Sequence, residues 1–221
     1  MAEHAIDAVL FDVNETLFSL EPLGPAFAEV GLDPAAVPLW FARLLRDGFA
    51  LAAMGDHRPF SELAADSLQG INPQLADEAV GRVLAAFRTM PPHPDVEPAL
   101  QLLHESGVPA LTLTNSSVEA VQGLLVGAGL DGYIRENLSA DTVGRWKPAP
   151  EPYRHAAEHL GVEPQRLVLV AAHPWDCAGA QAAGLRSAWI NRASVPWPRV
   201  YPAPTATDDN LPALVATLLH G

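Results

Sequence analysis

The stretch AIDAVLFDVNET, residues 5–16, decides the fold, because an acid stands where a short aliphatic run ends. The run over residues 5–11 is typical of a strand that is buried in a parallel sheet. A charge cannot lie unpaired inside such a strand without a large cost. Asp12 should therefore lie at the carboxyl end of the strand and face a crevice.

Short aliphatic runs and helical patterns alternate along the rest of the chain. We expect further strands at 108–114, 166–172 and 186–191, and helices at about 96–106, 117–128, 150–160, 175–184 and 209–219. The proline-rich segment 195–205 should be a surface connection before the last helix. This alternation predicts an α/β fold with a doubly wound, parallel, Rossmann-like sheet.

Strand patterns are missing between residues 19 and 90, where helical patterns replace them. An all-helical segment is therefore inserted after the first strand. The stretch MPPHPDV, residues 90–96, is a return linker, because prolines end helices and favour extended backbone. We expect a Rossmann-like core of residues 1–18 and 91–221, with a helical cap subdomain of residues 19–90.

Composition excludes several classes of protein. The chain has 221 residues, of which 49% are hydrophobic, so it can bury a substantial core. Its formal charge of -13 argues against nucleic acid or an anionic membrane as a partner. The single cysteine, Cys177, excludes an internal disulfide, and the first residues lack the features of a secretory signal. We expect a cytoplasmic protein that acts on a small molecule, with neither nucleic acid nor membrane as a partner.

Polar residues follow the predicted strands, at the edge where ligands bind in open α/β sheets. Asp12 can stay ionised in a crevice only if positive charge or hydrogen bonds compensate its burial, and Lys147 is the natural counter-ion. The full set comprises Asp12, Asn14, Glu15 and Thr16 after the first strand, Thr114, Asn115 and Ser116 after the second, Lys147 in GRWKPAPEPY, and His173 and Asp176 in AAHPWD.

These residues, in this order, resemble the motifs of the haloacid dehalogenase superfamily, and within it the type II L-2-haloacid dehalogenases. The resemblance extends over almost the whole chain and includes the segments LTLTN, WKPAPEPY, VAAHPWDCAGAQAAG and WINR. It implies that Asp12 attacks carbon and forms an enzyme ester, which water then hydrolyses. It further implies roles for Thr16 as the hydrogen-bonding neighbour of the nucleophile, Thr114 and Asn115 as contacts to the substrate carboxylate, Lys147 as the motif lysine, Tyr153 as the motif tyrosine and Asp176 as the acid of the fourth motif.

Asn14 favours displacement at carbon over phosphoryl transfer. Phosphatases of the superfamily carry a second aspartate at this position, because their leaving group needs a proton, whereas a halide does not. They also hold Mg²⁺ with two acids in the fourth motif, where this chain has Ala171 and Ala172 before His173 and only Asp176 remains. We therefore expect no metal and no cofactor. Mg²⁺ would be required if the protein were a phosphatase, whose substrate can supply oxygen ligands itself.

Two residues depart from the pattern of the dehalogenases. His173 stands where these enzymes carry asparagine, and it could be a general base, hydrogen-bond a departing halide or replace the hydrogen bonds of the amide. Phe41 follows Trp40, at the position where the dehalogenases carry an arginine that binds the halide. Arg43, two residues on, points about 200° away on a helix and does not substitute. Phe41 and Trp175 could instead form an apolar halide pocket.

The sequence is compatible with three functions. The first is a hydrolase that displaces halide from a small 2-haloalkanoic acid through an ester on Asp12. The second is a magnesium-dependent phosphatase, and the third is a catalytically silent ligand-binding protein of the same fold. The resemblance also implies a possible homodimer. Two connections, near residues 18–24 and 90–95, should let the cap open and close over the nucleophile.

Overall fold

The computed structural model describes residues 6–220 and contains a six-stranded parallel sheet. Its strands follow the order β3-β2-β1-β4-β5-β6, and each neighbouring pair is parallel. The predicted α/β fold is confirmed. Residues 1–5 and 221, which include the start of the first predicted strand, lie outside the described residues. The strands are β1 (Ala8–Phe11), β2 (Ala110–Thr114), β3 (Ile134–Ser139), β4 (Leu167–Ala171), β5 (Arg186–Ile190) and β6 (Ala206–Asp208).

β3 and β6, which form the two edges of the sheet, were not among the predicted strands. The sequence of β3, IRENLS, exposes its second residue and half-buries the next two, so it shows no continuous apolar run. The three residues of β6 include none that is buried. Edge strands have one side open to solvent and carry charged residues, which weakens the hydrophobic pattern that identifies a strand.

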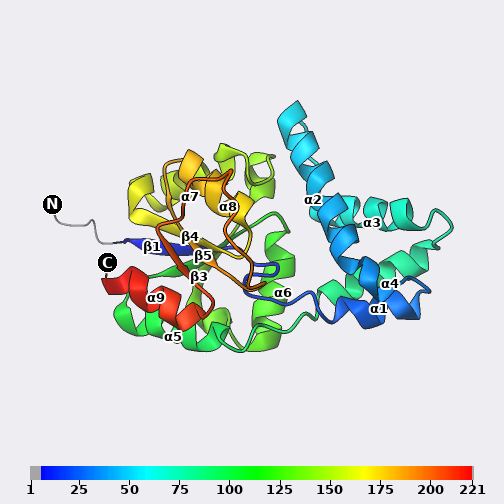
Figure 1. The fold of residues 1–221 in the computed structure, drawn as a ribbon, viewed down its shortest axis with the longest axis horizontal. Helices are drawn as coiled ribbons and strands as arrows, with labels where there is room; N and C mark the ends of the chain where they lie inside the picture. The colour runs from blue at the N-terminus through cyan, green and yellow to red at the C-terminus, as the bar shows by residue number, and fades with distance from the viewer. Residues whose placement is uncertain (1–5, 221) are drawn as a thin grey trace.

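Helices cover both faces of the sheet (Figure 1). Alternate residues of β1 point to opposite faces: Val9 and Phe11 pack in one apolar cluster with α5, α6 and α9, whereas Ala8 and Leu10 pack in the other with α7 and α8. The helices of the core are α5 (Val96–Ser106), α6 (Val118–Ala128), α7 (Pro150–Leu160), α8 (Pro174–Ala182) and α9 (Leu211–His220), with 3₁₀ turns η2 (Asp131–Tyr133), η3 (Ala140–Val143) and η4 (Pro164–Arg166).

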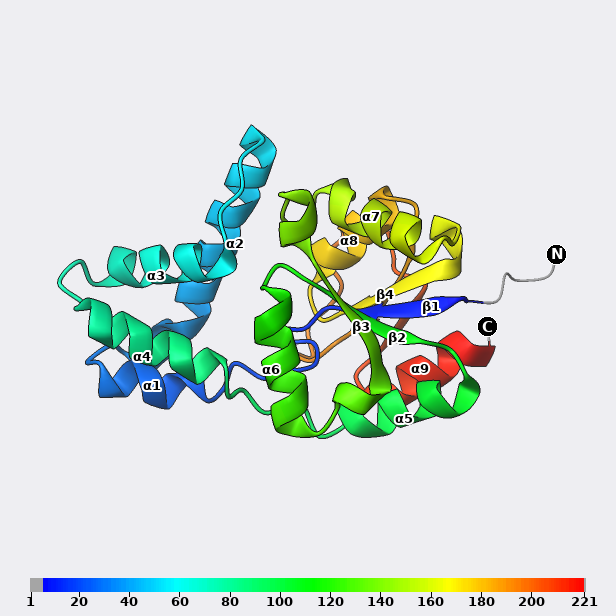
Figure 2. The ribbon, with the colours of Figure 1, turned by 180° about the vertical axis from the view of Figure 1, so that it is seen from behind.

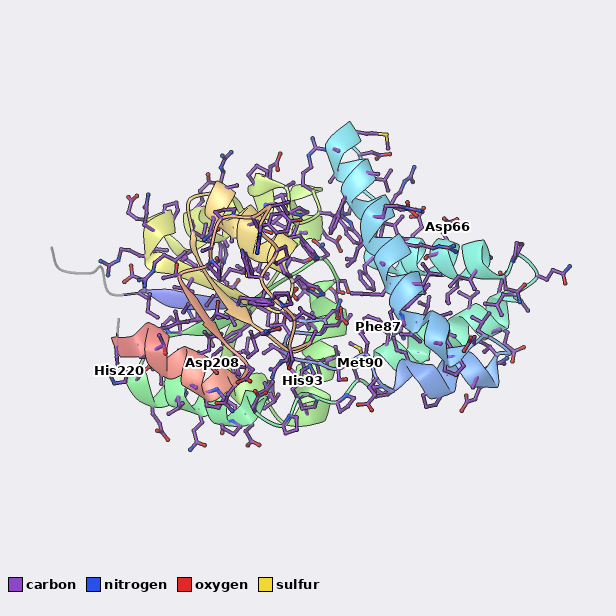
Figure 3. The ribbon with its side chains drawn as sticks, in the orientation of Figure 1. Asp66, Phe87, Met90, His93, Asp208 and His220 are labelled. Atoms are coloured by element: carbon purple, nitrogen blue, oxygen red, sulfur yellow. The ribbon has the colours of Figure 1, made fainter. Side chains whose placement is uncertain are left out.

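The insertion between β1 and α5 folds as a separate group of helices beside the sheet, and α6 lies on the side of the sheet that faces them (Figures 1 and 2). The return connection runs through Met90 and His93 (Figure 3). The limits of the cap at 19–90 stay a prediction. No helix within residues 6–220 combines the length and apolar character that a membrane crossing needs. The elements of the group are α1 (Leu23–Glu29), η1 (Pro34–Ala36), α2 (Val37–Met54), α3 (Phe60–Ile71) and α4 (Asp77–Phe87).

Trp146, from the loop before α7, joins the core to the cap helices. Its side chain is fully buried, its ring stacks on Phe60 of α3, and its Nε1 donates to the carbonyl of Arg58. It also packs on Gly48 of α2, where a Cβ atom would stand 2.4 Å from the indole ring. Because Trp146 directly precedes Lys147, the cap contact and the candidate site share one loop.

Gly48→Ala is expected to weaken this cap contact. The added methyl group would overlap a buried, stacked ring, and overpacking of this kind costs about 1–3 kcal/mol. We expect a lower melting temperature and faster proteolytic cleavage at residues 18–24 and 90–95. Gly81→Ala is the matched control, because nothing lies within 4 Å of its Cβ position on α4. Equal melting temperatures for the two variants would show that the contact between Gly48 and Trp146 does not contribute to stability.

Candidate active site

Asp12 lies at the carboxyl end of β1, between β2 and β4, where the direction of strand succession reverses. Ligands of open α/β folds bind at this point. The side chain is 5% exposed, and its two oxygens have different partners. Oδ1 accepts from Lys147 Nζ at 2.9 Å, and Oδ2 accepts from Thr16 Oγ1 at 2.7 Å. The backbone N–H of Ala172 donates to Thr16 Oγ1, so the hydroxyl hydrogen is directed at Asp12.

Lys147 is fully buried and has three hydrogen-bond acceptors. Its Nζ donates to Asp12 Oδ1 at 2.9 Å, to Asp176 Oδ2 at 2.6 Å and to the carbonyl of Leu113 at 2.7 Å. Burial alone would lower the pKa of Lys147, but the two carboxylates outweigh burial and raise the pKa. For Asp12, burial alone would raise the pKa, but the Lys147 and His173 cations outweigh burial and lower it. The candidate nucleophile is therefore ionised at neutral pH.

Asp176 and Tyr153 complete the buried network behind Lys147. The Tyr153 hydroxyl donates to Asp176 Oδ1 at 2.5 Å, and neither side chain is exposed. Burial raises the pKa of both residues, with the Lys147 ammonium opposing the shift of Asp176. Tyr153 is thus a neutral donor. Asp176, on the first turn of α8, is the site carboxylate best able to accept a proton, because a raised pKa means a stronger conjugate base.

His173 lies on the other side of Asp12 and contacts two carboxylates. Its Nδ1 is 3.3 Å from Asp12 Oδ2, and its Nε2 is 2.8 Å from Glu15 Oε2. Burial alone would lower the pKa of His173, but the hydrogen bonds and charges of Asp12 and Glu15 outweigh burial and raise it to about 10. The resting imidazole is therefore a cation that donates from both nitrogens. An imidazolium cannot accept a proton, which disfavours the general-base role among the alternatives that the sequence left open.

Glu15 belongs to this site, although its position in the sequence predicts no role for it. Its φ angle of 62° lies in the left-handed region, which residues other than glycine rarely adopt. Its backbone N–H donates to the carbonyl of Phe18, and its carbonyl contacts His93 Nε2 at 3.1 Å, so the turn is held from both sides. The one available signal was an acid that follows the nucleophile by three residues.

Asn115 holds Lys147 in place through its backbone. The amide Oδ1 accepts from the Lys147 N–H at 2.8 Å, and Nδ2 donates to the Lys147 carbonyl at 3.2 Å. Thr114 Oγ1 accepts from the N–H of Ser116 at 3.0 Å, and Asn14 Nδ2 donates to Ser116 Oγ at 3.2 Å. These side chains order the loop after β2 beside Asp12. Direct contact of Thr114 and Asn115 with a substrate carboxylate stays a prediction.

A cavity of about 180 Å³ lies beside Asn14, between the start of α6 and the cap helices. Ser116 and Ser117 supply polar groups to its wall, and Ser117 is the N-cap of α6, where a helix favours an anion. Phe87 lies on the side of the cap that faces the sheet (Figure 3). The volume suits a small acid, since drug-sized ligands need several hundred cubic ångströms. The cap contributes Phe60, Leu84, Phe87 and Arg88 to the lining.

Phe41 and Trp175 both place their rings beside His173. The ring centroid of Phe41 is 6.2 Å from that of His173, and the Trp175 ring stacks on His173 at 5.1 Å. Aromatic faces attract cations, so this aromatic wall supports the protonated imidazole. Arg43 donates instead to the carbonyl of Gly70. His173 is therefore the cation beside Phe41. Phe41 is the residue that stands where the resemblance implies an arginine.

Within residues 6–220, no group of three or more histidine, cysteine or acidic side chains is arranged to hold a metal ion. The candidate site residues that the structure brings together in one network are Asp12, Thr16, Lys147, Tyr153, His173 and Asp176. The expected absence of a metal and of a cofactor stays a prediction.

The family model, the relatives and the solved structure that match this chain all carry dehalogenase names. A family model described as haloacid dehalogenase-like hydrolase matches residues 6–184. Haloacetate dehalogenase H-2 of Moraxella sp. (strain B) is 27% identical, over 95% of this chain and 96% of the relative. (S)-2-haloacid dehalogenase 2 of Pseudomonas sp. (strain CBS-3) is 27% identical, over 85% of each chain. A solved L-2-haloacid dehalogenase structure, 26% identical, superposes with a TM-score of 0.91 over 99% of this chain and 100% of the other.

Proposed function

Because the chain belongs to the haloacid dehalogenase-like hydrolases, we propose that it displaces halide from a small 2-haloalkanoic acid through an ester on Asp12. One observation carries this proposal. The Lys147 ammonium helps to keep Asp12 ionised. Two residues later the chain has Asn14, whose amide Nδ2 donates to Ser116. Such a site has a nucleophile but lacks the neighbouring acid that an alkoxide leaving group needs. Two relatives are named for dehalogenation of haloacetate and of (S)-2-haloacids.

In the first step, a carboxylate oxygen of Asp12 attacks the carbon that bears the halogen. The new C–O bond forms as the carbon–halogen bond breaks, and the halide leaves with the bonding electron pair. Thr16 and Lys147 fix the attacking carboxylate in one orientation. The substrate carboxylate binds at the start of α6, where Ser116 and Ser117 line the cavity. Asn115 supports this step by holding the backbone of Lys147.

In the second step, water attacks the ester carbonyl carbon of Asp12. Asp176 accepts the proton that water loses, because burial raises the pKa of this carboxyl. The ester C–O bond then breaks, the 2-hydroxy acid leaves, and Asp12 returns to its carboxylate. Lys147 bridges the two acids throughout, and the neutral Tyr153 orients Asp176. The sum of both steps consumes water and releases one halide and one proton.

Halide release from a small panel tests this function. The substrates are fluoroacetate, chloroacetate and both enantiomers of 2-chloropropionate, each measured in EDTA. We expect release from at least one of them, with the same rate when Mg²⁺ replaces EDTA, because the proposed reaction uses no metal. Folded protein that releases halide from none of the four would contradict the proposal. Hydrolysis of phosphorylated substrates only when Mg²⁺ is added would support the phosphatase reading instead.

We also propose that the enzyme is cytoplasmic and works without a cofactor, and we retain the possible homodimer as a prediction. The acidic composition and the single cysteine support the first point. Phe41 stands where the resemblance implies a halide-cradling arginine, and its ring lies beside the His173 cation. Phosphoryl transfer has less support, because the amide of Asn14 can neither donate nor accept a proton as a general acid or base does.

A further inference from the structure

Glu15, His173 and Asp12 form a hydrogen-bonded row at the nucleophile. Glu15 Oε2 lies 2.8 Å from His173 Nε2, and His173 Nδ1 lies 3.3 Å from Asp12 Oδ2. The Glu15 side chain is 42% exposed, whereas the other two are at least 85% buried. Glu15 takes this position with a backbone φ of 62°, a conformation that glycine would adopt more easily. A strained acid aimed at a histidine indicates a role for the contact.

The two oxygens of Asp12 differ in the donors that face them. Oδ1 receives a hydrogen bond from Lys147, whereas Oδ2 faces two donors, Thr16 and His173. Each donated hydrogen bond withdraws electron density, so Oδ1 is the better nucleophile. When Oδ1 becomes the ester oxygen, Oδ2 becomes the carbonyl oxygen, which turns negative as water attacks. Two donors aimed at that oxygen have the arrangement of an oxyanion hole.

Geometry also separates His173 from the departing halide. In a displacement at carbon, the leaving group departs on the side opposite the attacking oxygen. His173 contacts an oxygen of the nucleophile itself, at 3.3 Å, so it lies on the attacking side of the carbon. It is therefore better positioned for ester hydrolysis than for halide departure.

We propose that Glu15 is a positioning residue that keeps His173 a cation, and that His173 stabilises the oxyanion on Asp12 Oδ2 during ester hydrolysis. This inference rests on the proposed function. Esterification removes the charge of Asp12, and the buried imidazolium then loses one of its two carboxylate partners. Glu15 remains as the anion that faces His173, and it also fixes Nε2–H so that Nδ1–H points at Oδ2. The Trp175 ring stacks on His173, the Phe41 ring lies 6.2 Å from it, and His93 contacts the Glu15 carbonyl.

The hydrolytic step balances with His173 protonated throughout. Water adds to the ester carbonyl carbon, its proton passes to Asp176, and the negative charge develops on Oδ2. Thr16 O–H and His173 Nδ1–H donate to this oxygen. The C–Oδ1 bond then breaks, and the departing alkoxide of the product takes the proton from Asp176. Asp12, which now contains one oxygen from water, releases the second water proton to solvent and regains its carboxylate.

Glu15→Gln tests the proposal by separating the two steps. The substrate is whichever haloacid the wild-type enzyme dehalogenates, and rapid quenching with mass spectrometry of the intact protein reports the ester on Asp12. We expect ester hydrolysis to slow about tenfold or more relative to the first-turnover halide release, so that ester accumulates; loss of a whole oxyanion donor costs roughly 10²- to 10³-fold. In the variant, hydrolysis should also decline as the pH rises through neutrality, because the imidazolium of the ester form then loses its proton.

Glu15→Gly is the matched variant, because it removes the carboxylate and also relieves the strained φ angle. It should fold at least as stably as wild type and show the same accumulation of ester. Ester hydrolysis with the rate and pH profile of wild type in both variants would overturn the proposal, as would equal slowing of halide release and hydrolysis. A wild-type enzyme that releases no halide would refute the proposed function itself, which is a distinguishable outcome.

Discussion

Asp12→Asn is expected to abolish halide release while leaving the protein folded. The amide cannot serve as the anionic nucleophile, and loss of a nucleophile from a catalytic unit lowers kcat on the order of 10⁴-fold or more. The side chain keeps its size, and Lys147 keeps the carboxylate of Asp176 and the carbonyl of Leu113 as acceptors. The measurement is halide release at saturating substrate, with the melting temperature recorded for the same preparation.

Asp131→Asn is the matched control, because it makes the same chemical change at an exposed position in the 3₁₀ turn before β3. It should retain wild-type halide release. A folded Asp12→Asn variant with more than about one hundredth of wild-type activity would contradict the ester mechanism, since removal of a nucleophile costs far more than that. The wild-type enzyme, quenched during turnover, should carry the mass of an ester on the peptide that contains Asp12.

The interior of the sheet could be predicted from the sequence, whereas its edges could not. β1, β2 and β4 are buried along their whole length, so their residues form short aliphatic runs. β3 contains Arg135 and Glu136, which lie in an edge strand whose open side needs no apolar residue. The order of the interior strands also explains why Asp12 and Asp176 both reach Lys147, since β1 and β4 are neighbours.

The sequence predicts the site residues that directly follow a strand. It does not predict contacts between distant segments, because these depend on the backbone geometry. Lys147 was assigned as the counter-ion of Asp12 because a buried carboxylate requires positive charge. That Lys147 also bridges Asp12 and Asp176 is evident only from the structure. The position of Glu15 three residues after the nucleophile was too weak a signal to predict its contact with His173, because that contact spans 158 residues and depends on a positive φ angle. The contact of Phe41 with His173 likewise joins cap and core, which no local pattern reveals.

Lys147→Met is expected to cause the largest loss of stability. The substitution keeps the length and apolar stem of the side chain but leaves two buried carboxylates, Asp12 and Asp176, without their shared cation. Removal of one partner from a buried ion pair costs about 3–5 kcal/mol. At about 2–4 °C per kcal/mol for a chain of this size, the melting temperature should fall on the order of 10 °C. Halide release should be lost as well, because Asp12 loses the ammonium that stabilises its carboxylate and fixes its orientation.

The pH dependence of this loss has a defined sign. In the wild-type protein the folded pKa of Asp12 is lowered, so its contribution to stability is present above the unfolded pKa, near 4, and is lost as the pH falls toward the folded pKa. Without Lys147, burial at Asp12 is opposed by His173 alone, and the upward pKa shift of Asp176 increases, so the folded variant binds protons more tightly than the folded wild type. The deficit relative to wild type should therefore be smaller at pH 5 than at pH 8.

The double variant Lys147→Met/Asp176→Asn identifies the cause. It removes one of the two carboxylates that lose their cation, while the amide can still accept a hydrogen bond from Tyr153 at the position of Oδ1. It should be more stable than Lys147→Met alone and should show a weaker dependence on pH, because repulsion between two buried anions is gone. A double variant that is less stable than the single one, with an unchanged pH dependence, would show that packing around the lysine stem, and not charge compensation, is what Lys147 supplies.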